Sequence, residues 1–163
     1  MNTRLSADDY ISLLLFYQRY AETLDAGQWE SWIDYFTDDC SYRVQARENF
    51  DRGLPLATLS FESKGMLKDR VYCIRKTLYY EPCWQRHVVG APVVTAAIQN
   101  TVSAHASYAV FRTKPDDVTQ VYNVGRYQDT LVRTPAADHG WLLQSRICVF
   151  DSDLIPNSMI YPL

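Results

Sequence analysis

The first segment places its apolar residues with the period of a helix. They recur three or four positions apart and share one wide face, which comprises Tyr10, Leu13, Leu14, Tyr17, Ala21 and Leu24. Ser6 with Asp9 three residues later resembles a capping box, and Gly27 suits the left-handed turn that ends a helix. The same spacing predicts a second, shorter helix through Trp29, Trp32, Ile33 and Phe36.

The rest of the chain shifts towards strand patterns. Residues 40–47 are strand-like and residues 48–53 read as a loop, after which Ser63 caps a third predicted helix with the apolar face Leu67, Val71, Ile74 and Leu78. Strands are predicted at 88–98, 102–113, 118–133 and 141–151. Gly125 lies inside one of them, where glycine often marks a bulge or bend.

Helices followed by long strands predict an α+β fold. We expect the N-terminal helices to pack on one face of a curved, mainly antiparallel sheet, which makes a cone with an apolar interior. The chain has no repeat, low-complexity tract or linker, so residues 1–163 are expected to form a single domain.

Charge and cysteine content narrow the function classes. The 16 basic and 19 acidic residues give a net charge of −3, which excludes a strongly basic nucleic-acid binder. The 22 aromatic residues (four Trp, twelve Tyr and six Phe) indicate a large core, a pocket or an interface. The four cysteines match no metal or redox spacing, and the N-terminus lacks a signal-peptide pattern. We therefore expect a cytoplasmic protein without a membrane segment, its cysteines free and mostly buried.

Three histidines are the candidates for acid–base chemistry. His139 is expected in an exposed turn and His105 on a solvated sheet face, whereas His87 is expected to be buried or interfacial. His87 or His105 paired with Asp25 or Asp34 would give a proton-abstracting site, as in small cone-shaped isomerases and dehydratases. A structural histidine is the competing interpretation.

Other chemistries lack their motifs. The sequence contains no Gly-x-Ser-x-Gly elbow, no glycine-rich phosphate loop, and no Cys-x-His or Cys-x-x-His pair for a Rieske cluster. We therefore expect no metal and no cofactor in this chain.

Aromatic and basic residues gather in the middle of the chain. Interfaces are enriched in Tyr, Trp and Arg, so this stretch predicts a contact with a partner through Tyr79, Tyr80, Trp84, Arg86 and His87. A solvated face with a few packed rings is the alternative. Residues 158–163 are also apolar, and such a tail is expected to dock on its own core or on a partner.

Several blocks together resemble a known family. The chain is similar to the small (β) subunits of aromatic-ring-hydroxylating Rieske non-haem iron oxygenases, and among them those of salicylate 5-hydroxylases. The blocks are Trp29-Glu30-Ser31-Trp32, Tyr35-Phe36, and residues 47–50, 53–56, 69–71, 85–90, 107–110, 145–152 and 160–163.

The resemblance implies a fold like that of nuclear transport factor 2 (NTF2) and a mainly structural role in an α3β3 hexamer. It implies that the large (α) subunit carries the Rieske [2Fe–2S] cluster, the mononuclear Fe(II) and the active site. Electrons would come from a ferredoxin and an NAD(P)H-dependent reductase, and the substrate would be an aromatic acid such as salicylate or a related benzoate. No catalytic residue carries over to this chain. A stand-alone isomerase or dehydratase and a non-catalytic ligand-binding module remain the alternatives.

Overall fold

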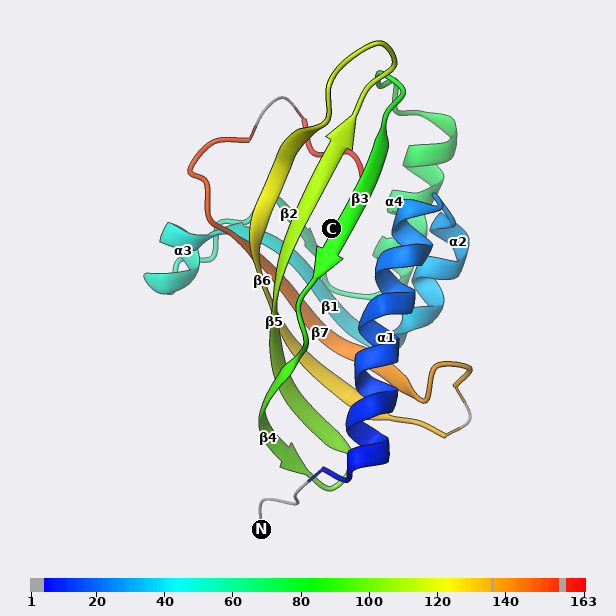
Figure 1. The fold of residues 1–163 in the computed structure, drawn as a ribbon, viewed down its shortest axis with the longest axis vertical. Coiled ribbons are helices and arrows are strands. Elements are labelled where there is room, and N and C mark those ends of the chain that lie inside the picture. The colour runs from blue at the N-terminus through cyan, green and yellow to red at the C-terminus, as the bar shows by residue number, and fades with distance from the viewer. Residues whose placement is uncertain (1–4, 136, 156–157) are drawn as a thin grey trace.

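The computed structural model describes residues 5–135, 137–155 and 158–163. Within them, seven strands form one sheet in the order β2-β1-β7-β6-β5-β3, and β4 also pairs with β5. The strands are β1 (Phe36–Ala46), β2 (Leu59–Phe61), β3 (Trp84–Val89), β4 (Val93–Ile98), β5 (Thr101–Thr113), β6 (Gln120–Arg133) and β7 (Trp141–Phe150). All pairs are antiparallel except β1 with β7. The sheet curves, and α1, α2 and α4 lie along one side of it (Figure 1). The predicted α+β class and mainly antiparallel sheet are confirmed.

Helix α1 (Ala7–Asp25) forms where the periodicity predicts it. Ser6 Oγ accepts a hydrogen bond from the Asp9 amide at 3.1 Å, and Gly27 follows the helix with φ +63°. Phe16 and Tyr20 join the predicted buried face, whereas Tyr10 and Leu14 are only half-buried. The buried face of the helix therefore combines three aromatic residues with aliphatic ones.

The second predicted helix is shorter than expected. Helix α2 (Trp29–Trp32) passes into the short 3-10 helix η1 (Ile33–Tyr35), and Phe36 already begins β1. The expected loop at 48–53 contains the short helix α3 (Arg47–Asp51). Helix α4 (Lys64–Lys76) is confirmed, and Ser63 Oγ caps it by accepting from the Met66 amide at 3.3 Å.

The predicted strand 88–98 is two strands. Strand β3 pairs with the second half of β5 and β4 with the first half, and the break falls at residues 90–92. Pro92 has no amide to donate to a ladder, which favours the break there. The alternation of β5 is confirmed, since Val102, Ala104, Ala106, Tyr108 and Val110 are all buried.

The sequence predicts a bulge or a bend at Gly125, and the bulge is wrong. Gly125 pairs in regular register with Tyr108 and Phe150, and the register shifts lie elsewhere. A Cβ atom at this position would lie 2.0 Å from the Val149 carbonyl oxygen. Glycine is required here because two backbones approach closely.

Candidate functional site

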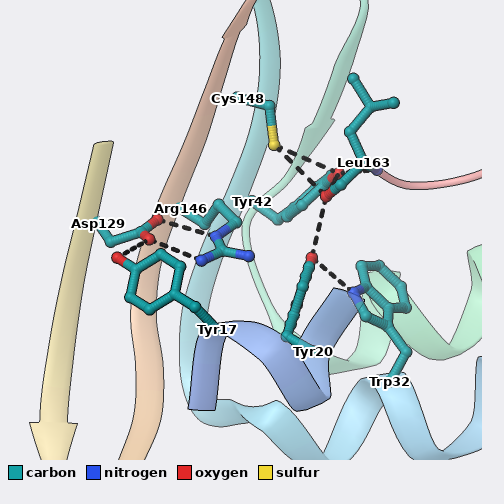
Figure 2. Close-up of polar contacts among 8 residues, drawn as sticks. All are labelled: Tyr17, Tyr20, Trp32, Tyr42, Asp129, Arg146, Cys148 and Leu163. Carbon is teal, nitrogen blue, oxygen red and sulfur yellow. Dashed lines mark hydrogen bonds and ion pairs between the residues drawn. The ribbon is translucent and has the colours of Figure 1, made fainter. Parts of the chain in front are cut away.

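A buried ion pair lies between α1 and the inner face of the sheet (Figure 2). Arg146 on β7 donates from Nε and Nη2 to the two carboxylate oxygens of Asp129 on β6, at 2.9 and 2.7 Å. Both side chains are completely buried. Tyr17 on α1 donates its hydroxyl to Asp129 Oδ2 at 2.5 Å. The bidentate geometry and the extra donor compensate the cost of burying two charges.

Two tyrosine rings enclose the guanidinium group. The Arg146 Cζ atom lies 4.1 Å from the centre of the Tyr20 ring and 4.0 Å from that of Tyr127, which is cation–π distance. Burial acts to lower the pKa of Arg146, but the Asp129 carboxylate together with Tyr20 and Tyr17 raises it further and holds the pKa above its ordinary value. Burial raises the pKa of Tyr17 and of Tyr127. At neutral pH the arginine is therefore charged and these phenols are neutral.

The last residues of the chain fill the adjoining part of the interior. The Leu163 amide donates to the Tyr42 hydroxyl at 2.8 Å, and the Tyr20 hydroxyl donates to the Leu163 carbonyl at 3.1 Å (Figure 2). Trp32 Nε1 in turn donates to the Tyr20 hydroxyl at 2.8 Å. Arg70 donates to the carbonyls of residues 159 and 160, both at 2.7 Å. Of the two expectations for the apolar tail, docking on its own core is confirmed.

The structure brings together one of the predicted His–Asp pairs. His87 Nδ1 lies 2.6 Å from Asp25 Oδ1, and both carboxylate oxygens accept from the His87 amide at 3.0 Å. The His87 side chain is completely buried, and its Nε2 has no hydrogen-bond partner among the described residues. Asp25 at the end of α1 thus fastens the helix to β3.

The other candidate acid–base residues lie apart. His105 is on the outer face of β5, half-buried, and Asp34 is exposed in η1. His139 is not simply exposed, as the sequence predicted: its ring stacks on Tyr35 at 4.3 Å, with 8° between the planes. Burial lowers the pKa of His139. The ring of Tyr35 provides the surface on which His139 packs. The polar sequence around His139 gives no sign of this contact.

No metal site can be assembled from these groups. Over residues 5–135, 137–155 and 158–163, no three His, Cys, Asp or Glu side chains are placed to hold a metal ion. All four cysteines are free; Cys40 and Cys148 are buried, while Cys73 and Cys83 are half-buried. None of the helices in the described part of the chain is long and apolar enough to cross a membrane.

The predicted interface stretch lies on the surface, except for His87. Tyr79, Tyr80 and Trp84 are 97%, 39% and 65% exposed, and Arg86 is also exposed. Side chains alternate along β3, so Trp84 and Arg86 point outwards while His87 points inwards. The predicted contact set therefore contracts to four residues.

The sheet extends this surface with an apolar patch. In the register, Arg86 pairs with Phe111 and Phe111 with Val121, while Val88 pairs with Ala109 and Ala109 with Val124. Val88, Val121 and Val124 are each more than 40% exposed. We call the set Tyr79, Tyr80, Trp84, Arg86, Val88, Val121 and Val124 the outer patch. Contiguous exposed apolar groups of this kind mark interaction surfaces.

The Arg146–Asp129 pair was not predicted from the sequence. Tyr127, Asp129 and Leu131 alternate along the strand and all point inwards. This alternation was the sequence feature that could have indicated a buried charge. A charge at a core position predicts an internal counter-charge. The pairing with β7 that supplies Arg146 is a tertiary feature that no local pattern contains.

Comparisons with known proteins agree on one family. Residues 19–157 match the family described as ring hydroxylating beta subunit. The chain is 33% identical over 153 residues to terephthalate 1,2-dioxygenase, terminal oxygenase component subunit beta 2, of Comamonas sp, covering 94% of the chain and 97% of the relative. It is 29% identical over 154 residues to the anthranilate 1,2-dioxygenase small subunit of Burkholderia cepacia, covering 94% of each.

One solved structure supports the same family, and another shows the fold. A beta subunit assigned to an aromatic-ring-hydroxylating dioxygenase of Novosphingobium aromaticivorans DSM 12444 superposes with a TM-score of 0.85 at 37% identity, covering 97% of this chain and all of that one. An NTF2-like protein with a cystatin-like fold from Novosphingobium aromaticivorans superposes with a TM-score of 0.65 at 20% identity, covering 90% and 84% of the two chains. The predicted NTF2-like fold is confirmed.

Proposed function

From the premise that the chain belongs to the ring hydroxylating beta subunit family, and so is a small subunit of an aromatic-ring-hydroxylating dioxygenase, we propose that its task is assembly. In this proposal it holds large subunits in a complex that hydroxylates an aromatic acid in aromatic catabolism. The chain supplies no catalytic residue of its own.

The filled interior is the observation that carries this proposal. A cone-fold enzyme needs an open cavity between the helices and the sheet to receive substrate. Here Arg146, Asp129 and the rings of Tyr17, Tyr20 and Tyr127 occupy that space, and the Leu163 end closes the part beside it. A packed interior makes the domain rigid, which suits a subunit whose proposed role is to bind large subunits through its surface.

The proposal extends to the whole complex. Iron centres do not fit the described residues of this chain, because these residues include no ligand set for them. We therefore assign the Rieske cluster and the mononuclear Fe(II) to the large subunit of an α3β3 hexamer. A ferredoxin and an NAD(P)H-dependent reductase deliver the electrons, which implies a cytoplasmic complex, and residues 1–163 act as one domain.

The substrate class is an aromatic carboxylic acid. The relatives are named for terephthalate and anthranilate, both of which carry a carboxylate on a benzene ring. The sequence blocks favour salicylate or a related benzoate within this class. Co-expressing both subunits and assaying hydroxylation of salicylate, anthranilate, terephthalate and benzoate discriminates among them.

The outer patch is the proposed contact with the large subunit. Buried Trp and Arg anchors dominate interface energies, and truncation of one typically weakens binding roughly 30- to 1,000-fold. Trp84→Ala and Arg86→Ala are expected to weaken the complex to this extent, as measured by affinity titration and by light-scattering mass. The Tm of the free chain should stay unchanged in Trp84→Ala, because Trp84 is 65% exposed and is no core residue. Arg86→Ala also removes an ion pair with Asp25 at 3.6 Å, and because Arg86 is exposed this should cost under about 1 kcal/mol.

Ile98→Ala is the matched control. Ile98 is 56% exposed at the end of β4, away from the β3 start that carries Trp84 (Figure 1). It should leave both assembly and Tm unchanged. An unchanged complex with both patch variants would remove the outer patch from the interface.

The His87–Asp25 pair favours a second candidate, a stand-alone isomerase or dehydratase. A carboxylate on Nδ1 orients a histidine whose Nε2 acts as general base. However, His87 and Asp25 line neither the cavity of about 320 Å³ next to the start of β3 nor the open one of about 510 Å³ along α1. If assembly is the function, His87→Gln should keep oxygenase turnover within about threefold once the complex is intact, which corresponds to under ~0.7 kcal/mol. A loss of several hundredfold in an intact complex would favour chemistry in this chain.

A further inference from the structure

A cavity of about 320 Å³ opens at the edge of the outer patch and shares Tyr79, Tyr80 and Val121 with it. Its walls come from the segment before β3, the facing ends of β5 and β6, and the last residues of the chain. This volume lies at the lower end of the range of small-ligand sites. The cavity is separate from the filled interior, and neither the proposed assembly role nor the family relationship requires it.

One cationic side chain in this cavity has no counter-charge. Arg112 forms no ion pair with any described residue, and its buried Nε has no hydrogen-bond partner among them. Two other charged lining groups pair with each other, since Lys114 Nζ lies 2.6 Å from a carboxylate oxygen of Glu81. Asp117 accepts from the Val118 amide at 2.8 Å and keeps its negative charge. Arg112 is therefore the cationic group of this lining that remains available to an anion.

A hydroxyl group next to Arg112 is also unused. The Arg112 Cζ atom lies 3.3 Å from the centre of the Tyr122 ring, so the guanidinium stacks on that ring. Tyr122 is only 8% exposed, and its hydroxyl has no partner within the described part of the chain. A buried hydroxyl without a partner is costly, and an acceptor from a ligand would satisfy it.

The remaining walls are aromatic. Tyr80 and Tyr161 meet edge to face with ring centres 5.0 Å apart, and Trp29 stacks on Tyr161 at 4.6 Å and holds it in place. Burial, followed by the neighbouring Tyr80, raises the pKa of Tyr161, so its hydroxyl is neutral and does not repel an anion. Rings in this arrangement accept another ring edge-on or stacked.

From this cluster we propose that the cavity binds a small monocyclic aromatic carboxylate. Its carboxylate would pair with Arg112 and accept from the Tyr122 hydroxyl, and its ring would pack against Tyr80 and Tyr161. The chain would then carry a ligand site of its own.

The test is a titration of the full-length free chain with benzoate, so its outcome does not depend on whether the chain assembles with a large subunit. Isothermal calorimetry measures affinity, and ring resonances of isotope-labelled tyrosines report the location. Saturable binding that shifts the Tyr122 and Tyr161 signals is expected. Benzamide, which has the same shape without the charge, should bind about 10- to 100-fold more weakly, as expected for the loss of a charged hydrogen bond.

Two variants locate the site. Arg112→Gln should weaken benzoate binding about 10- to 100-fold, and Tyr122→Phe should weaken it while keeping the ring in place. Arg133→Gln is the matched control, because Arg133 pairs with Asp9 at the other end of β6 and should leave affinity unchanged. If Arg112→Gln does not fold, the affinity of Tyr122→Phe and the comparison of benzoate with benzamide still test the proposed site.

Three results would overturn the proposal. They are the absence of saturable benzoate binding, equal affinity for benzoate and benzamide, and wild-type affinity in Tyr122→Phe and every folded Arg112 variant. A fourth such result can come from repeating the benzoate titration by NMR with the labelled chain in complex with the unlabelled large subunit. Loss of the tyrosine shifts in that complex would identify a side chain of the partner as the occupant instead.

Discussion

At the scale of single residues, the interior depends on one charge pair. Arg146 and Asp129 pair where both side chains are fully buried, and Tyr17 adds a donor to Asp129 from the helix side. Arg146 Nη1 has no hydrogen-bond partner among the described residues. Such a pair contributes little relative to a well-packed apolar core, but removing one partner leaves an unpaired buried charge. The pair therefore makes the packing of α1 on the sheet specific.

Arg146→Met should lower the free energy of unfolding by about 3–5 kcal/mol, because Asp129 loses its counter-charge. Urea denaturation of the free chain measures this. Arg146→Met combined with Asp129→Leu should recover most of the loss. Arg52→Met is the control: Arg52 pairs with Glu48 on the surface, so its replacement should cost under about 1 kcal/mol. A single variant as stable as the wild type would contradict this account of the interior.

His139 gives the fold a pH dependence near neutrality. Burial lowers the pKa of His139 in the folded chain, while the unfolded chain takes up its proton near the ordinary value of about 6.5. The unfolded state therefore binds more protons as the pH falls, and stability drops below about pH 6.5 until the lower folded pKa is passed. Urea denaturation at pH 7.5 and 5.5 should show this drop for the wild type and a smaller one for His139→Phe, which keeps the stack on Tyr35. Equal drops in both proteins would assign the effect to other groups.

At the scale of elements, β6 and β7 meet at a position that tolerates no side chain. A Cβ at Gly125 would lie 2.0 Å from the Val149 oxygen and 2.8 Å from the Phe150 Cα atom, and both atoms belong to backbone. Gly125→Ala should therefore destabilise the chain by about 3 kcal/mol or more in thermal and urea unfolding. Gly65→Ala at the start of α4 meets only the Ser63 hydroxyl at 3.5 Å and should stabilise by up to about 1 kcal/mol. If both alanine variants shift stability in the same direction, the close approach at Gly125 is wrong.

Local patterns predicted most elements and failed where tertiary contacts decide. The caps at Ser6 and Ser63 and the alternation of β5 are local, and the sequence analysis placed them correctly. The break between β3 and β4 depends on both strands sharing β5, and the short strand β2 exists because β1 pairs with it. Neither cause appears within the segment itself.

At the scale of the whole molecule, the outer patch and the filled interior were also predictable only where local sequence patterns determine them. The exposure of Trp84 and Arg86 and the inward position of His87 follow from strand alternation, once β3 is known to start at Trp84. The aromatic-rich stretch indicated an interface, but the valines of β6 that complete the outer patch needed the register. The filled interior needed three elements and the chain end at once, which no sequence pattern contains.

Labelling of the four cysteines tests whether the large subunit covers the outer patch in the assembled complex. Burial raises the pKa of Cys148 to about 12 and also raises that of Cys40, so both should resist N-ethylmaleimide at neutral pH. Cys73 and Cys83 are half-buried, and the free chain should therefore take up two labels natively and four in urea, as counted by intact mass. Cys83 lies between Tyr80 and Trp84, so binding of the large subunit to the outer patch should slow its labelling at least about tenfold, while Cys73 provides the internal reference. A Cys83 that reacts as fast in the complex as in the free chain would mean that the large subunit binds elsewhere on this chain.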